Sequence, residues 1–275
     1  MEPVVRLSKI KAATENFKNV AKVLKCPHCQ EVFEVDDQSL LCLNNHRYNL
    51  NRKGYVQFSK PLNDQLYTKD LFTARREIIT SNIYEPFIRA LKKYCDDTYG
   101  LVVDAGCGEG SFLKQVLEDR DKPFGLGLDL ALSGIDLASD DINHNYLVAD
   151  LANMPLQDQS GDLILNILSP ANYTEFQRIL KDDGHLIKVI PNENYLKEIR
   201  DLTTHSDYSN DEVLNILNDK MDIISSEDVT YTVEITRLQS EQLLAMTPMS
   251  NHQTYTKQLT EITIDLRICL CRKKV

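Results

Sequence analysis

The feature that most constrains this chain is a short apolar run that ends in an aspartate and then turns through closely spaced glycines. Leu101-Val102-Val103 has the pattern of a buried strand, Asp104 follows it, and the turn 105–110 leads into a helix pattern over 111–118. Glycines at a strand-to-helix turn let the backbone approach a ligand closely, and the helix N-terminus favours negative charge. This segment therefore predicts a ligand-binding α/β sheet.

The spacing of these glycines separates two classes of ligand. The glycines are spaced G-x-G-x-G, at Gly106, Gly108 and Gly110. Dinucleotide-binding proteins use G-x-G-x-x-G, and here Ser111 stands where their third glycine packs the helix on the strand. Carboxylates at Asp104 and Glu109 would repel a pyrophosphate, whereas S-adenosylmethionine carries an ammonium and a sulfonium. The turn therefore favours S-adenosylmethionine, with Asp104 and the glycines among its contacts.

Two further strand patterns also end in an acid. The run 124–128 is followed by Asp129, and the run 145–149 is followed by Asp150. Ligands of open α/β sheets bind at the carboxyl ends of the strands. We expect Asp129 to accept from both ribose hydroxyls and Asp150 from the adenine amino group, with a helix cap as the alternative role for either acid.

Over residues 100–190 this pattern resembles the class I S-adenosylmethionine-dependent methyltransferases. That resemblance implies a Rossmann-like α/β fold with a seven-stranded sheet. A fourth strand is expected at 162–168, a helix at 174–180 and a fifth strand at 185–190. The last two strands are expected at 228–236 and 261–271, where apolar and polar residues alternate.

A second motif lies near the amino terminus. Cys26, Cys29, Cys42 and His46 follow the spacing C-x2-C-x12-C-x3-H, which is typical of structural zinc sites. The residues between the two pairs form a hairpin pattern, so each pair would stand near an open end of the hairpin. Four such ligands predict one structural zinc ion, without an open coordination position, in a zinc-ribbon-like module. His28 could replace His46, and reduced cysteines without a metal are the remaining alternative.

Charge is divided unevenly along the chain, whose formal net charge is -10. Residues 1–100 hold 16 Lys+Arg and 12 Asp+Glu, whereas residues 101–275 hold 15 and 29. A basic front segment on an acidic body is able to present phosphate-binding residues, although a solvated surface explains the same counts. The candidates for RNA phosphate are Arg47, Arg52, Lys53, Arg75 and Arg76. The last two lie in a helix expected over 70–94 and interrupted near Pro86, where their alternative role is to solubilise the helix.

Composition excludes several classes of protein. No apolar run approaches the roughly 18 residues that a membrane-spanning helix requires, and the first residues lack the apolar stretch of a secretory signal. We therefore expect a cytoplasmic protein with no membrane partner. Its seven cysteines are expected to be thiols or metal ligands rather than disulfides.

Over nearly its whole length the chain resembles the 23S rRNA (guanine-N1)-methyltransferases, the family that includes tylosin-resistance enzymes. The segments that carry the resemblance are the metal quartet, 53–56, 74–76, 84–86, 104–110, 169–173, 191–200 and 246–248. Of these, 169–173 and 191–200 are most similar to the Gram-positive, tylosin-resistance branch. The resemblance implies an RNA-recognition module over 1–60, a helical connector over 61–99 and a methyltransferase domain over 100–275.

In that family the cofactor is contacted at positions matching Tyr84, Gly108, Glu109 and Tyr195. Some members have His where this chain has Tyr195, and some have aromatic residues after the segment matching 246–248, where this chain has Met249-Ser250-Asn251. The resemblance thus implies that the cofactor is S-adenosylmethionine, with Tyr195 as a departure from the family pattern.

The implied reaction transfers a methyl group from a sulfonium to N1 of a guanine in a 23S rRNA hairpin. Guanine N1 carries a proton and lies on the Watson–Crick edge, so the base must be unpaired or extruded. Asn166, Ser169 and Asn172 are candidates to position the base, with loop capping as the alternative for Ser169 and Asn172, and we assign no general base. Two other functions stay open, a small-molecule methyltransferase and a noncatalytic zinc-ribbon RNA-binding protein, and so does a homodimer.

Overall fold

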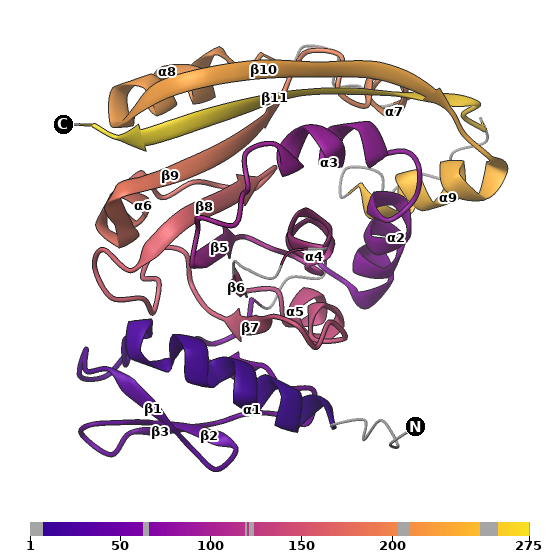
Figure 1. The fold of residues 1–275 in the computed structure, drawn as a ribbon. Helices are drawn as coiled ribbons and strands as arrows, with labels where there is room; N and C mark the ends of the chain where they lie inside the picture. Colours follow the sequence, from indigo (N-terminus) through magenta and orange to yellow (C-terminus); the bar gives the residue numbers. More distant parts are fainter. Residues whose placement is uncertain are drawn as a thin grey trace, which may run out of the picture.

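The computed structural model describes residues 8–62, 66–118, 120, 124–202, 209–247 and 258–274. Its centre is an eight-stranded sheet (Figure 1). In spatial order the strands are β10 (Met221–Glu234), β11 (Glu261–Lys273), β9 (Leu180–Pro191), β8 (Gly161–Ile167), β5 (Leu101–Ala105), β6 (Phe124–Asp129), β7 (Asn145–Val148) and β4 (Val56–Gln57). β11 is antiparallel to both neighbours, and the other neighbouring strands are parallel. The predicted Rossmann-like fold is confirmed, and β4 adds a strand at one edge.

Helices cover both faces of this sheet, because successive side chains of a strand point to opposite faces. Val102 of β5 packs on the first face, where α2 (Lys69–Ile79), α3 (Glu85–Lys92), α4 (Ser111–Leu117), α5 (Leu132–Ala138) and α9 (Arg237–Met246) bury their apolar sides. Leu101 and Val103 face the other side. There they pack with α1 (Lys9–Val20), α6 (Tyr173–Ile179) and α8 (Asp211–Lys220).

The helix expected over 70–94 is divided into α2 and α3. The hydroxyl of Thr68 accepts a hydrogen bond from the backbone N–H of Leu71 at 3.2 Å, which caps the start of α2. Pro86 lies in the first turn of α3, where its missing N–H costs no helical hydrogen bond. The break between the helices carries Tyr84, which is the residue before α3.

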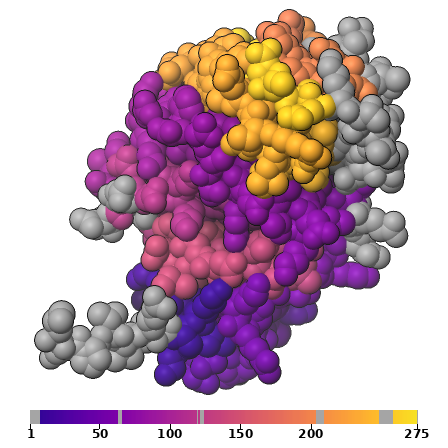
Figure 2. Space-filling model, turned by 90° about the vertical axis from the view of Figure 1, so that its right-hand side faces the viewer, coloured from indigo at the N-terminus to yellow at the C-terminus, as the bar shows by residue number. Residues whose placement is uncertain are grey.

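The amino-terminal segment forms a small sheet of its own. β1 (Phe33–Asp36), β2 (Ser39–Cys42) and β3 (Arg47–Asn49) pair antiparallel in that order. The predicted hairpin is confirmed, and β3 and α1 are additions to it. This segment, in indigo, forms the lower part of the molecule, and the last strands lie at the top (Figure 2).

The small sheet and the central sheet share one buried core. Phe17, Leu24 and Phe33 belong to the same apolar cluster as Val103 of the central sheet. Residues 56–57 fall inside the predicted amino-terminal module, yet they pair with β7 as strand β4. The predicted division of the chain at residues 60 and 99 stays a prediction.

Two strands begin earlier than the sequence pattern indicated. β9 begins at Leu180 rather than at residue 185, and β10 begins at Met221 rather than at 228. β10 is longer than predicted because it pairs with β11, which continues to Lys273 opposite Met221. Pairing between distant segments, rather than local alternation, therefore fixes these ends.

Candidate functional site

The glycine turn after β5 is pressed against the loop that follows β8. Gly106 has a φ of 85°, and a Cβ atom built there would lie 1.9 Å from Oγ of Ser169. Gly110, with a φ of 78°, precedes α4 and packs on Tyr146 in the same way. Both positions therefore require glycine for two reasons, the left-handed backbone and the lack of space.

Asp129 and Asp150 lie at the edge of the sheet beside this turn. The Asp129 carboxylate accepts from the backbone N–H groups of Gly108 at 2.9 Å and Ala131 at 2.8 Å. Asp150 accepts from the N–H of Ala152 at 2.8 Å. Both acids also line one cavity of about 320 Å³, so the capping role and a ligand role are compatible in the same side chains.

A second cavity, of about 280 Å³, shares two lining residues with the first. Arg75 and Leu168 line both cavities. The first cavity is lined by the turn and the strand-end acids, among them Gly106, Gly108, Asp129, Asp150, Ser169 and Pro170. The second is more apolar and is lined by Tyr84, Phe112, Pro191, Tyr195, Arg200, Met246 and Thr247, among others.

Tyr84 and Tyr195 meet in the second cavity, although they are far apart in the sequence. Their hydroxyl oxygens are 2.6 Å apart, so the two side chains share a hydrogen bond. Tyr84 stands at the start of α3, and Tyr195 follows the end of β9. The resemblance had implied cofactor contacts for both residues, and the structure places them together on one wall.

Buried charge concentrates behind the glycine turn. Nε of Arg75 lies 3.2 Å from Oε2 of Glu109, whose side chain is 1% exposed. Burial raises the pKa of the Glu109 carboxyl, against the opposing effect of the Arg75 guanidinium. Burial, and after it the charge of Asp129, also raises the pKa of Asp104 to about 8. Such acids favour a positively charged ligand, because a nearby cation stabilises a carboxylate.

The three predicted base-positioning residues have different surroundings. Ser169 lines the first cavity. Asn172 caps α6 by accepting from the N–H of Glu175 at 3.3 Å, and its amide donates to the carbonyl of Leu151. Asn166 is fully buried, and Lys188, a residue that the sequence analysis did not single out, donates to its Oδ1. The signal for Lys188 was available, since it is a lysine inside an apolar strand pattern.

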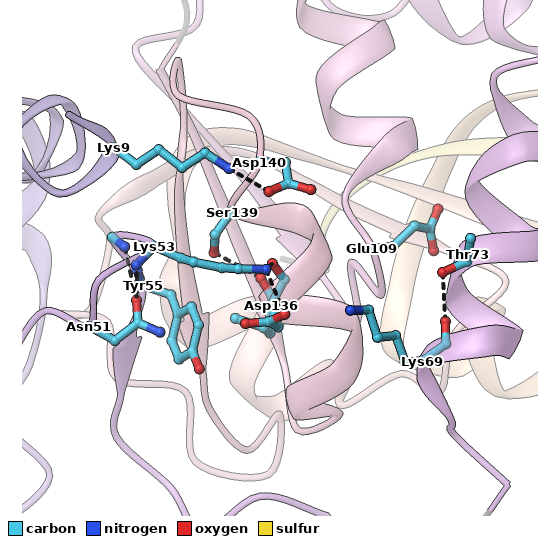
Figure 3. Close-up of polar contacts among 12 residues, drawn as sticks. Lys9, Asn51, Lys53, Tyr55, Lys69, Thr73, Glu109, Asp136, Ser139 and Asp140 are labelled. Carbon is cyan, nitrogen blue, oxygen red and sulfur yellow. Dashed lines mark hydrogen bonds and ion pairs between the residues drawn. The ribbon is translucent and has the colours of Figure 1, made fainter. Parts of the chain in front are cut away.

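Most of the cations predicted to contact RNA are held by carboxylates of the protein. Lys53 pairs with Asp136 at 2.6 Å, which ties the amino-terminal segment to α5 (Figure 3). Arg47 pairs with Asp36, and Arg76 pairs with Asp140, which Lys9 also contacts at 2.6 Å. Within the described residues, Arg52 is exposed and forms no ion pair. The role of these five residues in RNA binding stays a prediction.

The four predicted metal ligands converge at the open ends of the hairpin. The ligand atoms of Cys26, Cys29, Cys42 and His46 all lie within 4.8 Å of one another. Nδ1 of His46 is 3.3 Å from Sγ of Cys42, and the Sγ atoms of Cys29 and Cys42 are 3.6 Å apart. Thiolates about 2.3 Å from a tetrahedral zinc ion stand about 3.7 Å from each other, so this donor set fits zinc. The His28 ring lies beside the His46 ring, with the ring centres 5.1 Å apart and the ring planes tilted by 40°.

Comparison with known proteins identifies the family. A family model described as a methyltransferase domain matches residues 103–188. The Bacillus subtilis protein YxjB, named "Putative 23S rRNA (guanine-N(1)-)-methyltransferase", is 36% identical over 191 residues, which cover 65% of this chain and 67% of that protein. This chain belongs to the 23S rRNA (guanine-N1)-methyltransferase family. It is an S-adenosylmethionine-dependent methyltransferase.

A second relative covers nearly the whole methyltransferase. The 23S rRNA (guanine(748)-N(1))-methyltransferase of Streptomyces fradiae is 28% identical over 275 residues, which cover 93% of this chain and 98% of that protein. Among solved structures, a Haloferax volcanii "putative methyltransferase" in complex with the Trm112 methyltransferase activator has a TM-score of 0.53 at 15% identity, covering 78% of this chain and all of that one. This likeness supports the fold alone. Among the described helices, none has the length and apolar character needed to cross a membrane.

Proposed function

We propose that this methyltransferase transfers the methyl group of S-adenosylmethionine to N1 of a guanine in a 23S rRNA hairpin. The observation that carries the proposal is the pair of cavities that meet at Arg75 and Leu168, beside the glycine turn. One cavity offers acids at strand ends, and the other offers an apolar wall with a tyrosine pair. The relatives from Bacillus subtilis and Streptomyces fradiae carry names that specify guanine N1 of 23S rRNA as the acceptor.

The first cavity is suited to the adenosine part of the cofactor. Asp129 is held by two backbone N–H groups, so its remaining lone pairs are oriented for the ribose hydroxyls. Asp150 is the acceptor for the adenine amino group, and the backbone at Gly106 and Gly108 lines the same space. Because these groups are fixed before binding, little ordering is needed when the cofactor enters.

The second cavity is suited to the amino-acid end and the methyl group. Arg75 can pair with the carboxylate of the cofactor, and Glu109 beside it can stabilise the ammonium. The Tyr84–Tyr195 pair then forms the wall, and we propose further cofactor contacts for Asp104, in the strand before the glycine turn, and for Gly110, at the end of that turn. The methyl group would lie near Leu168, where the two cavities meet.

The rate of methyl transfer depends mainly on the alignment of the reacting atoms. The guanine nitrogen, the methyl carbon and the leaving sulfur must lie in line, and holding reactants in such a geometry supplies much of the rate enhancement. As the N–C bond forms, the bond between the methyl carbon and sulfur breaks, its electron pair stays on the sulfur of the neutral thioether, and the N1 proton is released to solvent. The guanine must therefore be extruded, with Ser169 in the lining of the first cavity as a candidate to orient it.

We further propose that the Cys26, Cys29, Cys42 and His46 cluster binds one structural zinc ion. A zinc ion there would close a tetrahedron and fix the hairpin, without an open coordination position for chemistry. Residues 1–60 would then recognise RNA, with the exposed Arg52 as a candidate phosphate contact. We also propose that the chain lies in the Gram-positive, tylosin-resistance branch, on the resemblance of its segments 169–173 and 191–200 to that branch.

Primer extension on 23S rRNA from cells with and without the gene tests the function. A methyl group on guanine N1 blocks base pairing and stops reverse transcriptase. We expect a stop one nucleotide before a guanine only when the gene is present. Identical stops in both RNAs, together with methylation of a small molecule by the purified protein, would replace this proposal with a small-molecule activity.

A further inference from the structure

Lys188 is a buried cation that the proposed function does not use. It lies in the middle of β9, opposite Asn166 of β8, and only 5% of the residue is exposed. Its Nζ donates to Oδ1 of Asn166 at 2.5 Å and to the carbonyl oxygen of Ser169 at 2.7 Å. On its other side, the residue paired with it in β11 is the buried Cys269. Because burying an ammonium is costly unless it is hydrogen-bonded, these two hydrogen bonds fix the position of Nζ.

Asn166 extends this network to the glycine turn. Its Nδ2 donates to the carbonyl oxygens of Ala105 at 2.8 Å and Pro170 at 3.0 Å. Ala105 is the last residue of β5 and comes directly before Gly106. Lys188 and Asn166 therefore join β9, the end of β5 and the loop 168–170 through four hydrogen bonds.

The loop that this network holds has an unfavourable backbone conformation. Leu168 has a φ of 53°, in the left-handed region that a residue with a branched side chain seldom adopts. Such a conformation persists only where the surroundings determine it. Leu168 also lines both cavities, and Ser169 and Pro170 line the first. A displacement of this loop would thus move the wall at the point where the two cavities meet.

We propose that Lys188 is a positioning residue, which fixes the loop 168–170 so that cofactor and acceptor base meet in line. It acts through the Ser169 carbonyl and Asn166 and touches neither reactant. Burial lowers the pKa of Lys188 to about 8. The inference rests on the proposed function only for its methyl-transfer readout, because cofactor binding is measured separately.

The test compares Lys188→Met with Lys181→Met. Lys181 lies on the same strand, but its Nζ pairs with Asp162 at 2.6 Å and its side chain is 43% exposed. Met fills the space of the lysine stem without a charge, but it leaves the oxygens of Asn166 and Ser169 without their donor, which destabilises the fold. We expect Lys188→Met to stay folded with a melting temperature several degrees lower, and to weaken S-adenosylmethionine binding about tenfold by calorimetry. Lys181→Met should bind the cofactor like the wild type.

Kinetics on a 23S rRNA fragment supply the second readout. A misplacement of about 1 Å can cost about a hundredfold in rate, so we expect kcat to fall by that order while KM for RNA changes less than threefold. Lys188→Gln, which keeps one donor, should be intermediate, and it carries the same test if Lys188→Met does not fold. A lower melting temperature with unchanged cofactor affinity and kcat would show a purely structural role and overturn the proposal. If the wild type binds the cofactor but does not methylate RNA, the proposed function fails while the affinity comparison still decides on Lys188.

Discussion

At the scale of single residues, Asp129 combines a structural contact with a position in the first cavity, where we propose that the cofactor binds. Two backbone N–H groups hold its carboxylate, and the same carboxylate lines the first cavity. Its charge is therefore oriented before any ligand binds. A ribose that donates two hydroxyl hydrogens to it would use the lone pairs that the backbone leaves free.

Asp129→Ala is expected to weaken S-adenosylmethionine binding roughly tenfold to a hundredfold, since hydrogen bonds to a charged group contribute about 1.5–3 kcal/mol. Asp162→Ala is the matched control. Asp162 also accepts from two backbone N–H groups, those of Gly100 and Leu101, but at the opposite end of the sheet strands. Isothermal titration calorimetry measures the S-adenosylmethionine affinity of both variants. Equal affinities for the two variants would show that Asp129 is only a backbone cap.

Asp104 gives the protein a pH-dependent stability. Its pKa is raised from 3.8 to about 8, so the folded protein holds a proton that the unfolded chain has already released. Below about pH 4, Asp104 is protonated in both states and does not lower the free energy of unfolding. As the pH rises from there toward 8, the free energy of unfolding falls by at most about 1.4 kcal/mol per pH unit. Asp104→Asn should therefore be more stable than the wild type at pH 8, with a smaller difference at pH 5. Denaturant unfolding without cofactor measures this, and a difference independent of pH would contradict it.

The strand-end acids could be predicted from the sequence, whereas the surroundings of Asn166 could not. Asp129 and Asp150 follow apolar runs, and parallel strands place their carboxyl ends at one edge. Asn166 also lies near a strand end, but it is buried and bonded to Lys188 in the neighbouring strand. That pairing depends on strand register, which local pattern does not determine.

At the scale of elements, the glycine turn and the loop 168–170 fit each other closely. Gly106 could be predicted from its place after a strand, because a tight turn requires left-handed backbone. Its contact with Ser169 could not, since the two lie far apart in the sequence. The short strand β4 was missed for a similar reason. It has two residues and depends on its pairing with β7.

Gly106→Ala should abolish detectable cofactor binding, because the added Cβ would overlap Ser169 and the backbone φ would be strained. The double variant Gly106→Ala/Ser169→Gly removes the overlap but not the strain. We expect it to recover part of the affinity and of the melting temperature, with Ser169→Gly alone as the control. If the double variant binds no better than Gly106→Ala, contact with Ser169 is not the reason for glycine at this position.

At the scale of the whole molecule, the shared core joins the amino-terminal segment to the sheet. Phe17, Leu24 and Phe33 pack in one apolar cluster with the central strands, and the Lys53–Asp136 ion pair crosses the same boundary (Figure 3). Loss of the proposed zinc ion would therefore affect the stability of the whole chain.

Cys42→Ser should bind less than one zinc per chain and unfold in a single transition, about 10 °C or more below the wild type. Cys95→Ser, at a buried cysteine outside the cluster, is the control and should keep its zinc. Metal analysis and calorimetry provide the measurements. Two separate transitions, with the upper one unchanged, would instead show that the amino-terminal module folds independently.

One reaction with the purified protein can show whether it methylates N1 of a guanine in 23S rRNA. Unmethylated 23S rRNA is incubated with S-adenosylmethionine and either the wild type or Asp129→Ala, then digested to nucleosides for mass spectrometry and probed in parallel by reverse transcription. With the wild type, we expect 1-methylguanosine in the digest and a reverse-transcription stop at one hairpin guanine. Both should be greatly reduced with Asp129→Ala. Absence of 1-methylguanosine with folded, cofactor-binding wild type, or methylation of a different atom, would contradict the proposed function.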